Sequence, residues 1–108
     1  MINPLKIPEM LSQANQIQEE VQRKLGQTVV EGSSGGGAVT ATMNGKKQLL
    51  KIRIDPAAVV GLTSGQPDVE MLEDLVVAAV NEAGRKAEEA LQSSLKNMLG
   101  GLNLPGLG

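Results

Sequence analysis

The sequence predicts a two-layer α+β fold, in which a helix, a three-stranded antiparallel meander and a long second helix follow in the order α-β-β-β-α. Two observations support this order. Apolar residues recur at spacings of three and four over residues 10–25 and 68–99, the period of one helix face. Between them, residues 39–54 alternate apolar and polar side chains around Asn44-Gly45, a pattern typical of a β-hairpin.

The first helix is expected to start near a proline and to end at Gly26, because proline suits the first turn and glycine often follows the last. Its apolar stripe consists of Met10, Ala14, Ile17, Val21 and Leu25. Residues 27–33 are expected to form a short strand. The glycine-rich stretch 32–37 is expected to be a flexible interstrand loop and not a phosphate-binding loop, because no lysine follows it and the next element is a strand.

A two-residue turn at Asn44-Gly45 would place Val39 opposite Leu50 and Met43 opposite Lys46. One face of the hairpin would then be apolar, with Val39, Ala41, Leu50, Ile52 and Ile54. The other face would carry Thr40, Thr42, Lys47, Leu49, Lys51 and Arg53. After the hairpin, Asp55-Pro56 is expected to cap a short turn that closes near Gly61.

The second helix is expected over Asp68–Leu99, with Asp68 as N-cap and the double glycine at 100–101 as the stop. At about 1.5 Å per residue it would be roughly 48 Å long, whereas a compact domain of this length has a radius of gyration of about 13 Å. The helix should therefore project beyond its own domain as an arm. Its apolar end is expected to pack against a second copy or another partner surface through Leu91, Leu95, Met98 and Leu99.

The composition of the 108 residues predicts one domain, residues 1–99, followed by a flexible tail, residues 100–108. The chain has no Cys, no His and no aromatic residue. Without His or Cys, and without a paired arrangement of other reactive groups, we expect no catalytic residue and no enzyme. No cofactor and no metal are expected either, because helix-dipole compensation explains the acids Glu70, Glu73 and Asp74. No apolar run approaches the length of a membrane span, and no signal peptide is recognised.

Charge is unevenly distributed although the net charge is only −2. Residues 32–54 contain four bases and no acid, whereas residues 55–108 contain eight acids and three bases. The bases of this island are Lys46, Lys47, Lys51 and Arg53. Two interpretations stay open, because lysines protect edge strands from aggregation and also bind anions such as DNA phosphates. The absence of aromatic side chains argues against single-stranded DNA and RNA, so that duplex DNA is the expected nucleic acid.

The helices carry further candidates for DNA contact. Three of these bases have an acid four residues before them, in the pairs Glu19–Arg23, Glu20–Lys24 and Glu82–Lys86. For these three and for Arg85, a solvated helix face is at least an equal interpretation, whereas Lys6 and Lys96 lack such partners and stay open candidates. The candidates are Lys6, Arg23, Lys24, Arg85, Lys86 and Lys96. Gly84, in the middle of the second helix, costs about 1 kcal/mol relative to alanine. We therefore expect it to allow close approach of the helix to the sheet or to a mate helix.

Four segments, taken in order, resemble the YbaB/EbfC family over nearly the whole chain. They are residues 39–45 (VTATMNG), 52–56 (IRIDP), 71–83 (MLEDLVVAAVNEA) and 104–106 (LPG). The resemblance implies a small bacterial nucleoid-associated protein of α-β-β-β-α fold that forms a tweezer-shaped homodimer, located in the cytoplasm at the nucleoid. It also implies binding of double-stranded DNA with weak sequence preference, and genes near those of replication and recombination.

The leading hypothesis is therefore a homodimer that binds duplex DNA through phosphates and regulates expression or organises the nucleoid. The alternative is a protein–protein adaptor of the replication or recombination machinery, engaged through the apolar arm and the acidic helix face. A salt titration of DNA binding separates these hypotheses, because phosphate contacts release counterions.

Overall fold

The computed structural model describes residues 6–64, 66 and 68–101, with Leu99 described by its backbone alone. The elements in order are α1 (Ile7–Gln27), β1 (Val29–Ser34), β2 (Val39–Asn44), β3 (Leu49–Ile54), α2 (Pro56–Leu62) and α3 (Val69–Gly101). The three strands form one antiparallel sheet in the order β1-β2-β3. The predicted meander between two long helices is therefore confirmed. The predicted tail lies outside the described residues, apart from its first two glycines, which continue α3.

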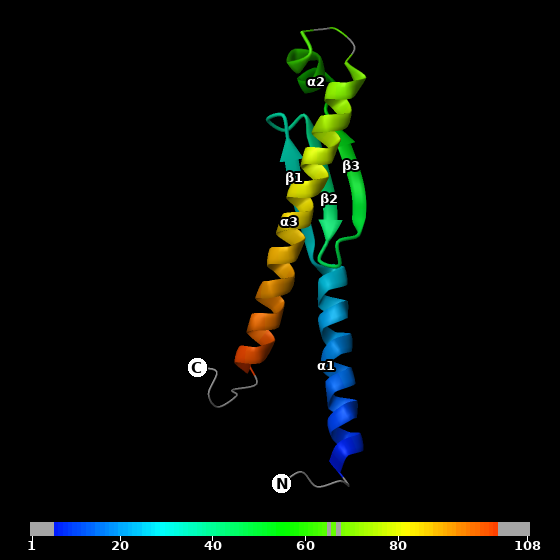
Figure 1. Cartoon of the computed structure of the whole chain (residues 1–108), viewed down its shortest axis with the longest axis vertical. Coiled ribbons are helices and arrows are strands. Elements are labelled where there is room, and N and C mark those ends of the chain that lie inside the picture. Colours follow the sequence, from blue (N-terminus) through cyan, green and yellow to red (C-terminus); the bar gives the residue numbers. More distant parts are fainter. Residues whose placement is uncertain (1–5, 65, 67, 102–108) are drawn as a thin grey trace.

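The molecule is far more elongated than a compact domain of its length. It measures 71 × 26 × 18 Å with a radius of gyration of 20.6 Å, against about 13 Å for a compact chain of about 100 residues. Figure 1 shows the reason: α1 and the C-terminal half of α3 both extend beyond the same end of the sheet. The predicted projection of the second helix is confirmed, and α1 projects as well.

The core lies between α3 and one face of β1 and β2. Three alanines of α3 pack on the strands, so the helix backbone comes very close to the sheet. The buried cluster consists of Val39, Ala41, Met43, Ala79, Ala83 and Ala87. The closest approach is at Gly32 of β1, where a Cβ atom would lie 2.2 Å from the backbone nitrogen of Ala83 and 2.5 Å from the carbonyl oxygen of Ala79. Glycine is therefore required at position 32 because the helix backbone occupies the place of its side chain.

The predicted hairpin register is wrong, whereas most of the predicted faces are right. Val39 lies opposite Ile54 and not opposite Leu50, because a bulge after Thr42 and a four-residue loop, residues 45–48, replace the two-residue turn. The Asn44 side chain stabilises this loop by accepting hydrogen bonds from the backbone nitrogens of Lys46 (2.9 Å) and Gln48 (3.0 Å).

The change of register shifts the partner of Val39 by four residues, an even number that keeps the alternating sides of a strand. Ile52 and Ile54 therefore stay on the face of Ala41 and Val39, as predicted. Two residues predicted on the polar face differ. Leu49 lies opposite Met43 at the bulge, on the apolar face, and Lys47 lies in the loop, where it pairs with Glu88 of α3. Gly45 serves close packing in this turn, since a Cβ there would lie 2.9 Å from the carbonyl oxygen of Leu25.

Both capping aspartates act as predicted. Asp55 accepts from the backbone nitrogens of Ala57 and Ala58 at the start of α2, and Asp68 accepts from that of Met71 at 2.9 Å at the start of α3. α3 continues to Gly101, two residues past its predicted end, because glycine weakens a helix without forbidding it.

α1 contacts the rest of the protomer mainly through its last two turns. Val21 and Leu25 are its buried residues, whereas the earlier members of the predicted stripe, Met10, Ala14 and Ile17, are exposed. An apolar stripe with no covering surface in the protomer is unusual, because apolar area exposed to water costs free energy.

Candidate nucleic-acid interface

The face of the sheet opposite α3 carries a small array of cations and hydroxyl groups. Because partners across antiparallel strands share a face, Lys51 lies on the same side as Thr42, and Arg53 lies on the same side as Thr40. Ser33 of β1 continues the second row, since it pairs with Thr40. α3 packs on β1 and β2 from the other side, so none of the helices in the described residues covers this face (Figure 1).

Lys51 and Arg53 are both exposed and lie two residues apart on β3, about 6.6 Å along the strand. Neither forms an ion pair with any residue that the structure describes. Glu31 lies two strands away from Lys51, about 10 Å. Asp55 lies two residues beyond Arg53, and its carboxylate accepts from the backbone nitrogens of Ala57 and Ala58 at the start of α2. The two side chains are therefore able to reach anions in solution without leaving a carboxylate behind.

The other two bases of the island, Lys46 and Lys47, lie in the loop between β2 and β3 and are directed onto the helices. A Cβ atom placed on Gly26 would lie 3.9 Å from the Nζ of Lys46, so this ammonium lies at the C-terminal turn of α1, where the helix dipole favours a cation. The Nζ of Lys47 lies 2.6 Å from Oε2 of Glu88 on α3. The island is thus divided into an outward pair on β3 and a loop pair that ties the sheet to α1 and α3.

Most bases of the helices are engaged within their own helix. Arg23 pairs with Glu20 at i,i+3, and neither i,i+4 pair that the sequence indicated for α1 forms within the described residues. On α3, Arg85 binds Glu82 at 2.7 Å and Glu89 at 2.5 Å. The predicted pair of Lys86 with Glu82 is present at 4.0 Å.

The hydrogen bond from Arg85 holds the pKa of Glu82 below its usual value, and the same contact raises the pKa of Arg85. Arg85 would have to leave two carboxylates to reach a phosphate, which makes it a weaker candidate. Lys6, Lys24 and Lys96 are exposed and have no acidic partner in the part of the chain that the structure describes. They lie near helix ends, away from the array on β3, and as DNA contacts they stay predictions.

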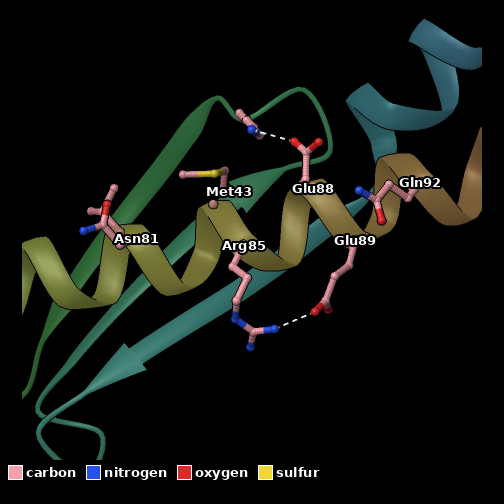
Figure 2. Close-up of a pocket in the computed structure, with 9 residues that line it drawn as sticks. Met43, Asn81, Arg85, Glu88, Glu89 and Gln92 are labelled. Carbon is pink, nitrogen blue, oxygen red and sulfur yellow. Dashed lines mark hydrogen bonds and ion pairs between the residues drawn. The ribbon is translucent and has the colours of Figure 1, made fainter.

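A hollow of about 630 Å³ lies on α3 beside the loop lysine (Figure 2). Met43, Val80 and Gly84 are its apolar part, and its polar lining is Lys47, Asn81, Arg85, Glu88, Glu89 and Gln92. A Cβ at Gly84 would meet nothing within 4 Å. The expectation that Gly84 allows close approach to the protomer's own sheet is therefore wrong, because Gly32 serves that contact; approach of a mate helix stays a prediction.

Sequence reasoning missed Glu88 and the contact of Lys46 with α1, since both partners are distant in the chain and only the folded register brings them together. Among the described residues, no group of three potential metal ligands from His, Cys, Asp and Glu is present. No helix in the described ranges has the length and apolarity to cross a membrane.

The comparisons with known proteins agree with this architecture. The sequence profile of the YbaB/EbfC DNA-binding family matches residues 4–102, and the chain belongs to this family. It is 65% identical over 104 residues, 96% of each chain, to a nucleoid-associated protein of Acidobacterium capsulatum. It is 56% identical over 98 residues, 91% of this chain and 92% of the other, to a nucleoid-associated protein of Koribacter versatilis.

A solved structure supports the fold independently. The crystal structure of an uncharacterized protein from Helicobacter pylori superposes with a TM-score of 0.74 over 92% of this chain and 99% of that one, at 22% identity. The membership predicted from the four sequence segments is therefore confirmed, and the class is that of nucleoid-associated DNA-binding proteins.

Proposed function

We propose that the protein binds duplex DNA as a homodimer, mainly through phosphates and with weak sequence preference, and that it organises the nucleoid or regulates expression in the cytoplasm. Contacts to phosphates carry little sequence information, which accounts for the weak preference. The observation that carries the proposal is the pair of outward cations, Lys51 and Arg53, on the face of the sheet that α3 leaves uncovered.

Hydroxyl groups beside these cations favour the same assignment. Threonine and serine side chains donate hydrogen bonds to phosphate oxygens and help to fix the orientation of a protein on the duplex. Thr42 is partly exposed and Ser33 is exposed on the face that carries Lys51 and Arg53. β3 is also an edge strand, where lysines prevent aggregation, and the salt titration below tests the DNA-binding role of these cations.

The homodimer is supported by apolar surface that the protomer does not cover. β3 is an edge strand, and Leu49, Leu50 and Ile54 on it are 48%, 54% and 41% exposed. An exposed apolar edge strand is a template for pairing with another chain. A second copy that pairs along β3 would bury these side chains and would place two sets of outward cations on one particle.

The projecting helices add to this argument. The exposed stripe of α1 and the apolar end of α3 extend from the same end of the sheet (Figure 1). Leu91 and Met98 are partly buried and Leu95 is exposed, whereas the side chain of Leu99, also predicted to pack here, lies outside the described residues. Arms of a tweezer-shaped dimer would present these surfaces to each other.

The test is a titration of a short duplex at several salt concentrations. A dimer that uses four outward cations should show a log–log salt slope of about −3.6, at about −0.9 per phosphate. The double variant K51Q/R53Q should lose most of this slope. The matched control K24Q/K96Q removes the same charge from the helices and should retain it. Absence of binding at low salt refutes the proposal. Equal losses in both variants contradict the assignment to Lys51 and Arg53, and a loss in K24Q/K96Q alone moves the site to the helices.

A second candidate function is favoured by the end of the molecule that carries α2 and the start of α3. Residues 55–84 contain six acids and no base, so this segment is less favourable for DNA than the basic segment before it. It also carries an apolar hollow of about 320 Å³ between α2 and the start of α3, lined in part by Val60, Val69 and Leu72. A protein of the replication or recombination machinery with a basic and apolar surface would fit there.

This adaptor function predicts a stoichiometric protein partner that remains bound after nuclease treatment. The variant V69D should lose that partner, because Val69 is exposed beside the hollow, while its affinity for duplex DNA stays unchanged. Recovery of no partner by the wild-type protein, or equal recovery by V69D, counts against this second function.

A further inference from the structure

Lys47 has an unusual position in the loop between β2 and β3. Its backbone is in the left-handed region, with φ of 65°. The loop around it is held by Asn44, a buried residue whose backbone carbonyl accepts from the nitrogen of Lys47 at 3.0 Å and whose side chain accepts from both neighbours of Lys47. The direction in which Lys47 leaves the loop is therefore set by the fold.

That direction leads to Glu88 on α3. The dashed line at the Glu88 carboxylate in Figure 2 marks its ion pair with the Lys47 ammonium, at a distance of 2.6 Å between Nζ and Oε2. The two side chains are 55% and 44% exposed, so the pair is open to water and to large anions. An exposed ion pair is weak enough to exchange one anion for another. A phosphate of DNA would thus compete with Glu88 for the same cation.

We propose that Glu88 withholds Lys47 from DNA, so that this one carboxylate sets how many cations each protomer offers to the duplex. The inference rests on the proposed function. A lysine that leaves Glu88 for a phosphate also leaves an unpaired carboxylate near the DNA, and like-charge repulsion offsets the new contact. Lys47 therefore adds little to counterion release while it is paired with Glu88, in contrast to Lys51, which has no acidic partner among the described residues.

The neighbouring Glu89 provides a matched control. It carries the same charge on the same turn of α3, but it binds Arg85, which keeps its second partner Glu82 when Glu89 is removed. The substitutions E88Q and E89Q therefore change the net charge equally, and E88Q alone releases Lys47. Both glutamates are at least partly exposed helix residues, so neither change removes a core contact.

The experiment measures binding of the full-length variants to a labelled duplex over a range of salt concentrations. We expect E88Q to bind about three- to tenfold more tightly than E89Q at about 50 mM salt, with a log–log slope steeper by about 0.9 for each Lys47 released. K47Q in the wild-type background should change the affinity by less than about twofold. In the double variant K47Q/E88Q the gain should disappear, because Glu88 acts only through Lys47.

Equal affinities of E88Q and E89Q overturn this inference, and so does weakened binding by E88Q, which would mean that the pair holds the loop in a binding conformation. A loss in K47Q as large as that in K51Q also overturns it. Salt-dependent binding by the wild-type protein with any of these results leaves the proposed function intact. No binding by any variant overturns both.

Discussion

The close contact between β1 and α3 predicts that Gly32→Ala is strongly destabilising. The added Cβ would lie 2.2 Å from the nitrogen of Ala83, 2.5 Å from the oxygen of Ala79 and 2.8 Å from the carbonyl carbon of Glu82. All three are backbone atoms of a helix, so no side chain can rotate away. Ordinary contacts between carbon atoms are about 3.5–4.0 Å, so the helix would have to retreat by about 1 Å or more.

The loss of stability follows from the gap that this movement of α3 would open between the helix and the sheet. The three buried residues Ala79, Ala83 and Ala87 have only a methyl side chain. If the helix moved away from the sheet, these side chains would be too short to keep contact with the strands. A radial gap of about 0.5–1 Å already forfeits a quarter to a half of a dispersion contact. Overpacking commonly costs about 1–3 kcal/mol, and contact with backbone atoms places this site at about 3 kcal/mol or above. That is a large share of the about 5–15 kcal/mol by which domains are stable.

The assay is urea unfolding followed by far-ultraviolet circular dichroism, since the chain has no tryptophan or tyrosine to report by fluorescence. The matched control is Gly84→Ala, where the added Cβ meets nothing of the protomer within 4 Å and helix propensity favours alanine by about 1 kcal/mol. All variants are compared at one protein concentration, because stability of a dimer depends on it. A Gly32→Ala protein within about 0.5 kcal/mol of the wild type would refute this account of the core.

Three further predictions test the caps, the charges and the edge strand. Asp68→Ala should lower the free energy of unfolding by about 0.5–2 kcal/mol in the same assay, because the backbone nitrogen of Met71 loses its acceptor. The pKa of Glu82 is lowered, so its contact with Arg85 stabilises the fold fully at pH values above 4.5, the ordinary glutamate pKa. This stabilisation is lost as the pH falls through the lowered pKa. The variant E82Q should therefore show a flatter pH dependence of stability in that acidic range. Leu50→Asp should halve the mass measured by light scattering without loss of helicity, because Leu50 is 54% exposed in the protomer; an unchanged mass would contradict pairing along β3.

The success of the sequence-based predictions follows the range of the interactions involved. Periodicity located both long helices, and the capping aspartates Asp55 and Asp68 were found because a cap acts on backbone groups two or three residues away. Alternation also placed Lys51 and Arg53 on one face, since the side-chain period of a strand does not depend on its partner.

The errors concern contacts between distant segments. Asn44-Gly45 has the sequence of a two-residue turn, yet Gly45 lies against Leu25 of α1, and the left-handed residue of the loop is Lys47. The sequence predicted a close approach to the sheet at Gly84, because this glycine lies in a helix, whereas the glycine that the packing of α3 on the sheet requires is Gly32. A glycine in a sequence indicates that another segment can come close, but the sequence does not show which segment that is.

By itself, the sequence determined the order of the elements, their apolar faces, the two aspartate caps and a basic segment without aromatic residues. These features depend on backbone periods and on neighbours within a few residues. Only the tertiary structure decided which cations are available to bind an anion. The Lys46 ammonium lies beside the last turn of α1, and Lys47 forms an ion pair with Glu88, whereas Lys51 and Arg53 are exposed. The physical reason is that the availability of a charge depends on the nearest opposite charge in space, and folding brings distant segments to the same place.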